Sequence, residues 1–181
     1  MRQQAADNNC VHTERWWRPA SLSNHTGFHR QVTLTVIRLK SMDLSPEQLR
    51  FIEAVRKPKH HRREIQLQKR FNGIPRAEQL DTLLYIFTHS NNYGDQQDCS
   101  RFLPDLVSDC DYALEELLMQ IAPTWNLSVE ELPDFLADVY GAERVVNTSK
   151  SLATQHPDDS YERRSLGAIA WWLKRRCPDG G

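Results

Sequence analysis

The fold class is decided by the stretch 75-PRAEQLDTLLYIF-87. Its apolar residues recur at the i, i+3, i+4, i+7 spacing that forms one face of an α helix: Leu80, Leu83, Leu84 and Phe87. Pro75 suits the start of a helix because a proline lacks the N–H that would have no intrahelical acceptor there. The stretch therefore predicts an amphipathic helix.

Similar signals precede this helix. Ser45-Pro46-Glu47-Gln48 has the hydroxyl, proline and amide of a capping box, and the helix that it opens is expected to end before Pro58. A second helix is expected over 59–71, ended by Asn72-Gly73. The N-terminal part of the domain is thus predicted to be helical from residue 46 onward.

Further helices are predicted downstream. We expect a helix over 100–121 with a restart at Pro104, one over 128–139 opened by a second capping box at Ser128, and a last one that runs to Arg176. Residues 91–95 are expected to form a loop and residues 146–159 a polar linker. About six helices without paired strands predict an all-α single domain, either a bundle or an irregular helical array.

The sequence also predicts where this domain lies in the chain. Residues 1–41 show neither helical nor strand periodicity, apart from a short β-rich run at 31–39, so they are expected to be a disordered arm or a translated leader before Met42. The helical domain is expected over 42–176, and residues 177–181 form a tail.

Charge is segregated along the chain although the formal net charge of the 181 residues is only −1. The basic segment 56–70 holds one acid and seven cations: Arg56, Lys57, Lys59, Arg62, Arg63, Lys69 and Arg70. The acidic half 95–143 holds twelve Asp or Glu and a single cation, Arg101. Such segregation marks either a partner surface or two faces that neutralise each other in the fold.

Other functional classes have little support in the sequence. The longest apolar runs are far shorter than the ~20 residues that span a bilayer, and no secretory leader is recognisable, so we expect no membrane partner and a cytoplasmic location. The four cysteines form no metal-binding or disulfide framework. Because no catalytic or phosphate-binding motif occurs either, we expect a non-enzymatic protein without a cofactor.

The leading hypothesis is a helical protein-interaction module that uses its acidic half to bind a protein partner or a second copy. Asp105 and Asp109, four residues apart, are the candidate acidic contacts. Trp171 and Trp172 are candidate anchors because tryptophan is enriched at interface hot spots.

Two alternatives stay open at this stage. The basic segment 56–70 favours nucleic-acid binding through phosphate contacts, although no aromatic residue is interleaved for base stacking. A metal-dependent enzyme would use His89, Asp95 and Asp98, the nearest set of possible ligands. Pairing of the basic segment with the acidic half inside one molecule would weaken both interaction hypotheses.

Overall fold

The computed structural model describes residues 44–57 and 63–176, and all of them belong to one compact unit of the chain, Ile37–Gly181. The predicted arm 1–41, with its strand at 31–39, and the predicted tail 177–181 lie outside the described residues.

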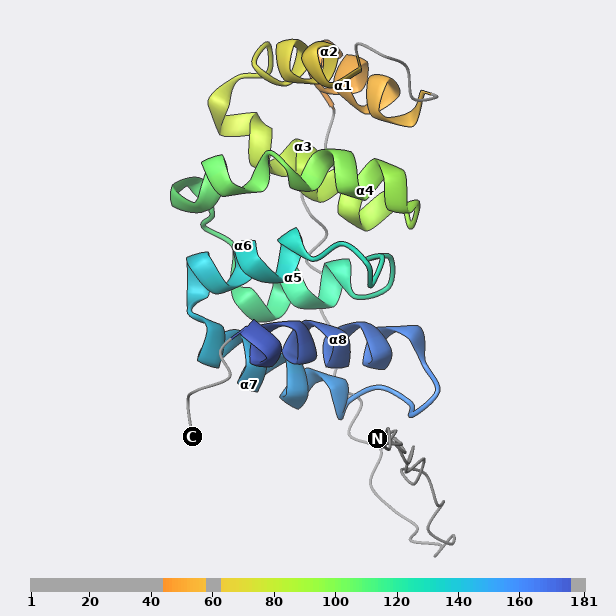
Figure 1. Cartoon of the computed structure of the whole chain (residues 1–181), viewed down its shortest axis with the longest axis vertical. Coiled ribbons are helices and arrows are strands. Elements are labelled where there is room, and N and C mark those ends of the chain that lie inside the picture. Colours follow the sequence, from red (N-terminus) through yellow and green to blue (C-terminus); the bar gives the residue numbers. More distant parts are fainter. Residues whose placement is uncertain (1–43, 58–62, 177–181) are drawn as a thin grey trace, which may run out of the picture. The chain divides into compact units, whose positions relative to one another are not determined.

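All regular elements of the described residues are helices, which confirms the all-α prediction (Figure 1). The predicted number of about six was too low, since this part of the chain has eight α helices and one 3₁₀ helix. The elements are α1 (Pro46–Arg56), α2 (Arg63–Phe71), α3 (Arg76–His89), α4 (Tyr93–Ser100), η1 (Leu103–Asp109), α5 (Leu114–Ile121), α6 (Glu131–Tyr140), α7 (Ala142–Ala153) and α8 (Tyr161–Arg176).

The helices pack in successive layers that follow the order of the chain (Figure 1). The layers are α1 with α2, α3 with α4, α5 with α6, and α7 with α8. Helix α1 packs against α2, α3 and α4, and α3 packs against α4, η1 and α5. Further along, α6 contacts η1, α7 and α8, and α7 packs extensively against α8. Each layer thus buries its apolar face against the next one, which is the arrangement of a helical array rather than of a bundle around one axis.

The extra helices come from two stretches that were predicted wrongly. The supposed linker 146–159 begins inside α7, because Val145, Val146, Ser149 and Leu152 form a buried stripe at helical spacing. Gly141, with a φ of 85°, separates α7 from α6. An L-residue is strained at this φ, so the glycine ends α6 and turns the chain into α7.

The predicted helix 100–121 is two separate elements, η1 and α5, and its first residue, Ser100, is the last residue of α4. Helix α4 begins already at Tyr93, within the supposed loop 91–95, because the side chain of Asn92 caps it by accepting a hydrogen bond from the Asp95 N–H at 3.1 Å. It ends at Ser100, and Pro104 then opens the short helix η1. The buried apolar residues of this stretch therefore lie on two short helices, Leu103 and Leu106 on η1 and Leu114, Leu117, Leu118 and Ile121 on α5.

A buried ion pair joins the first two layers. The Arg63 guanidinium, at the start of α2, contacts the Asp98 carboxylate on α4 through Nε at 2.8 Å and Nη2 at 2.6 Å. The same guanidinium donates hydrogen bonds to the carbonyl groups of Val55 and Lys57 at the end of α1. The two side chains are only 10% and 7% exposed, so one cation satisfies the end of α1 and holds α2 onto α4.

Two buried amide side chains also join neighbouring layers, through hydrogen bonds. Gln48 on α1 donates a hydrogen bond to Thr82 on α3 at 2.9 Å. Gln96 on α4 donates to the Thr124 carbonyl at 2.9 Å and accepts from the Asn126 N–H at 2.8 Å. These bonds fix successive layers relative to one another, since each buried amide loses a partner if the layers separate.

The Arg63–Asp98 pair should dominate the stability of the α1–α4 region. We expect Asp98→Asn to lower the free energy of unfolding by about 3–5 kcal/mol, because it leaves a buried guanidinium without its counter-charge. Urea unfolding followed by circular dichroism measures this loss. Arg101→Gln, which removes the exposed partner of Glu64, is the control and should cost at most about 1 kcal/mol. Equal losses in the two variants would contradict the structural role of the buried pair.

Candidate interaction surfaces

The basic segment does not act as one surface. Arg63 is buried in its ion pair with Asp98, and Lys59 and Arg62 lie outside the described residues. The remaining four cations are exposed: Arg56, Lys57, Lys69 and Arg70. The basic segment and the acidic half thus meet inside the molecule at Arg63, and again where Glu64 pairs with Arg101 at 3.2 Å.

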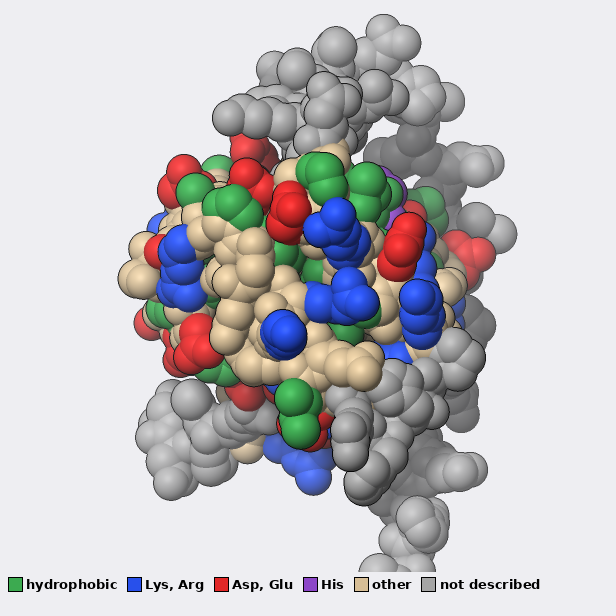
Figure 2. All heavy atoms as spheres, turned by 90° about the horizontal axis from the view of Figure 1, so that it is seen from above, with side chains coloured by type: hydrophobic (Ala, Val, Ile, Leu, Met, Phe, Trp, Pro, Cys, Tyr) green, Lys and Arg blue, Asp and Glu red, His purple; other side chains and the backbone are tan. Residues whose placement is uncertain are grey.

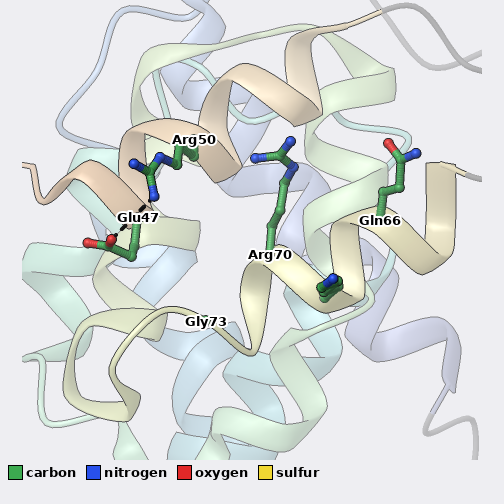
Figure 3. A pocket seen from close by; sticks show the side chains of 6 residues that line it. Glu47, Arg50, Gln66, Arg70 and Gly73 are labelled. Atoms are coloured by element: carbon green, nitrogen blue, oxygen red, sulfur yellow. Dashed lines mark ion pairs between the residues drawn. The ribbon is translucent and has the colours of Figure 1, made fainter.

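Lys69 and Arg70 contribute to a groove between α1 and α2, which we call the basic groove (Figure 3). Its lining residues are Glu47, Arg50, Gln66, Lys69, Arg70 and Gly73. Arg70 and Gln66 extend from α2 toward α1 in Figure 3, and Arg50 lies on α1. The lining includes three cations and one carboxylate, and Glu47 compensates Arg50 at 3.5 Å.

The face over α1 and α2 shows Lys and Arg side chains gathered near its centre, with Asp and Glu around them (Figure 2). Two large apolar side chains are exposed on the same two helices. Leu49 on α1 is 46% exposed, and Ile65 on α2 is 72% exposed. These two helices therefore carry both positive charge and uncovered apolar surface.

The acidic half contains buried and exposed carboxylates with different roles. Asp98 is buried with Arg63, whereas Asp105 and Asp109 lie exposed on η1. Arg76, at the start of α3, pairs with the Asp109 carboxylate at 2.5 Å and donates a hydrogen bond to the Asp105 carbonyl. The side chain of Asp105 thus remains exposed, while part of the charge of Asp109 is compensated inside the chain.

Two tyrosines fix the segment that follows η1. The Tyr112 hydroxyl donates to Asp81 on α3 at 2.5 Å, and the Tyr140 hydroxyl donates to the Tyr112 carbonyl at 2.7 Å and lies 3.2 Å from the Cys110 sulfur. Burial, and next the hydrogen bond to Asp81, raises the pKa of Tyr112 above its ordinary value. Burial also raises the pKa of Tyr140, so both phenols stay protonated and keep donating at neutral pH.

Arg76 and Tyr112 thus tie α3 to η1 and the residues after it, and we call the four carboxylates of these segments the acidic edge: Asp81, Asp105, Asp109 and Asp111. Asp81 comes from α3 and is half-buried, and the other three are exposed on η1 and just after it. Arg76 and Arg144 flank the edge, the latter with its guanidinium 5.9 Å from the centre of the Tyr140 ring. The sequence alone did not indicate Asp81 or Arg76, because both lie well before the acidic half.

The residues considered as metal ligands have other partners. The His89 ring stacks on Tyr85 at 4.0 Å, Asp95 accepts a hydrogen bond from Ser90 at 2.9 Å, and Asp98 pairs with Arg63. Within residues 44–57 and 63–176, no three His, Cys, Asp or Glu side chains come together in a way that could hold a metal ion.

The two adjacent tryptophans on α8 have different environments. Trp171 is 53% exposed, and the Arg175 guanidinium lies 5.3 Å from the centre of its ring. Trp172 is half-buried against the core and donates a hydrogen bond from its indole nitrogen to the Leu127 carbonyl at 3.1 Å. Of the two, Trp171 is thus the side chain available to a partner.

Comparisons with protein-family models, with curated proteins and with solved structures found no match to this chain. In the described part of the chain, no helix has the length and apolar character needed to cross a membrane.

Alanine substitution should separate the two tryptophans. We expect Trp171→Ala to change the free energy of unfolding by less than about 1 kcal/mol, since it removes an exposed ring with one cation–π contact to Arg175 and one edge contact to Trp172. Trp172→Ala should cost roughly 2–3 kcal/mol, because it removes a half-buried ring and leaves the Leu127 carbonyl without its donor. Thermal and urea unfolding measure both values, and equal losses would contradict the environments assigned here.

Cys99 should be unreactive in the folded protein. Burial, reinforced by the charges of Asp98 and Asp95, raises the pKa of its thiol well above the ordinary value, so little thiolate forms at pH 8. In a variant that retains only this cysteine (Cys10→Ser, Cys110→Ser, Cys177→Ser), reaction with a thiol reagent should occur only as urea unfolds the chain. Rapid modification in native buffer would contradict this burial.

Proposed function

We propose that the protein is a non-enzymatic helical interaction module that binds a basic surface of a protein partner through its acidic edge. The observation that carries this proposal is the exposure of Asp105 and Asp111 on a held backbone: Arg76 binds the Asp105 carbonyl, and Tyr140 binds the Tyr112 carbonyl next to Asp111. Rigid presentation favours binding because little conformational freedom is lost when the partner docks.

The exposed carboxylates contribute little to the fold itself. Asp98, in contrast, stabilises the fold, because it is buried beside a guanidinium that is also hydrogen-bonded to the Val55 carbonyl. Asp105 and Asp111 are exposed instead, and exposed charges add little to stability. Their concentration on one edge is more useful for steering a basic partner and for orienting it.

The nucleic-acid alternative has less support from the geometry. Arg63 is buried in its ion pair with Asp98 and is not available to a phosphate. The exposed cations lie at the ends of two different helices, Arg56 and Lys57 at the end of α1 and Lys69 and Arg70 at the end of α2. A phosphate backbone is bound tightly only through many such contacts at once. Trp171 offers a second protein-binding feature and is consistent with the interaction proposal.

Neutralising the acidic edge tests the proposal. The variant Asp105→Asn/Asp111→Asn removes two exposed charges and leaves the Arg76–Asp109 pair intact. In nuclease-treated lysate at low salt, the tagged full chain should capture a protein with a basic surface, the untagged chain included, in stoichiometric amount, and this variant should lose most of it. Raised salt should also weaken capture by the wild type, because dissolved ions screen the exposed charges that form the contact.

The matched control is Glu53→Gln/Asp159→Asn, which removes two exposed acids from outside the acidic half. It should retain the partner, and circular dichroism should show unchanged helix content in both variants. Capture that survives neutralisation of Asp105 and Asp111 at low salt would contradict the proposal. A bound species that is destroyed by nuclease would instead favour the nucleic-acid alternative.

A further inference from the structure

The chain presents two surfaces of opposite charge that the α2–α3 turn connects. Gly73 lines the basic groove, and Arg76, three residues later, binds Asp109 of the acidic edge. The groove carries three cations and one carboxylate, and the edge carries four carboxylates flanked by two arginines. The net charges of the two surfaces are therefore opposite and similar in size.

We infer that the acidic edge binds a second copy of this chain, whose basic groove supplies Arg50, Lys69 and Arg70. This inference rests on the proposed function, for which it names a partner. The groove belongs to α1 and α2, and the edge to α3, η1 and the residues after η1, so each copy offers both halves of the contact.

The charge distribution favours a second copy over a foreign polyanion. With a formal net charge of −1, two copies approach each other almost without net repulsion, whereas their segregated surfaces attract locally. Three cations, one of them compensated by Glu47, are also few for a nucleic-acid strand.

The exposed apolar residues on the two helices of the groove support a protein as the occupant, and Ile65 lines a neighbouring hollow together with Lys69. Leu49 precedes Arg50 on α1, and Ile65 precedes Gln66 on α2 and lies one turn before Lys69. A protein surface can cover both side chains, which removes apolar area from water. A phosphate backbone offers nothing apolar to cover them.

The expected association is weak and depends on salt. Exposed ion pairs change an equilibrium constant by only a few-fold each, so neutralising two of them should weaken the contact about tenfold. Sedimentation velocity of the full chain over a range of concentrations at low salt should show reversible association, and raised salt should reverse it.

Two neutralised variants test the contact directly. Lys69→Gln/Arg70→Gln weakens the groove, and Asp105→Asn/Asp111→Asn weakens the edge. Each variant alone should sediment as a monomer at concentrations at which the wild type associates. An equimolar mixture should form a one-to-one heterodimer, because the intact groove of one variant meets the intact edge of the other. Arg164→Gln/Lys174→Gln, which neutralises two exposed cations on α8, should associate like the wild type.

The outcomes separate this inference from the proposed function. A wild-type chain that stays monomeric, or a mixture that does not associate, overturns the self-association. The self-association is also overturned if Lys69→Gln/Arg70→Gln leaves it unchanged but abolishes binding of a single-stranded oligonucleotide. If the acidic edge still captures a foreign basic protein in these cases, the proposed function stands alone. Capture that is indifferent to Asp105 and Asp111 overturns the proposed function itself.

Discussion

The structure depends on one buried cation. Arg63 reaches from the start of α2 to the Asp98 carboxylate on α4 and to the last carbonyls of α1, so three helices share a single guanidinium. A buried charge is tolerated only when it is paired and its donors are satisfied, which constrains all three helices together. The position of the first layer, and with it the basic groove, follows from this constraint.

The same pair also separates the charges that are buried in the fold from those that stay on its surface. The basic segment and the acidic half neutralise each other where Arg63 meets Asp98 inside the fold. Fewer charges remain on the surface than the sequence suggests. They gather in two places, a groove between α1 and α2 and an edge around η1. Because the edge is held by hydrogen bonds from Tyr112 and Tyr140, its carboxylates are presented in a fixed arrangement. Such an arrangement suits recognition of a charged protein surface.

The sequence predicted the elements whose signals are local. The capping box at Ser45 and the stripe in 75–87 depend on residues within one or two turns, and both helices were found where expected. Helix α4 was missed because its buried residues are mainly polar, and Gln96 packs through hydrogen bonds to residues about thirty positions away. The candidate interaction surfaces were likewise predicted only where the signal is local. The exposure of Asp105 follows from its polarity, whereas the withdrawal of Arg63 into the core depends on partners distant in sequence.

The central claim, that one buried ion pair fixes the layer carrying the basic groove, is tested most directly by hydrogen exchange in Asp98→Asn. Mass spectrometry resolves the exchange of each helix under native conditions. The account predicts faster exchange in α1, α2 and α4 of the variant, with the α7–α8 hairpin as protected as in the wild type. Unchanged protection in α1 and α2 would contradict it, because these helices would then be held in place without the Arg63–Asp98 pair.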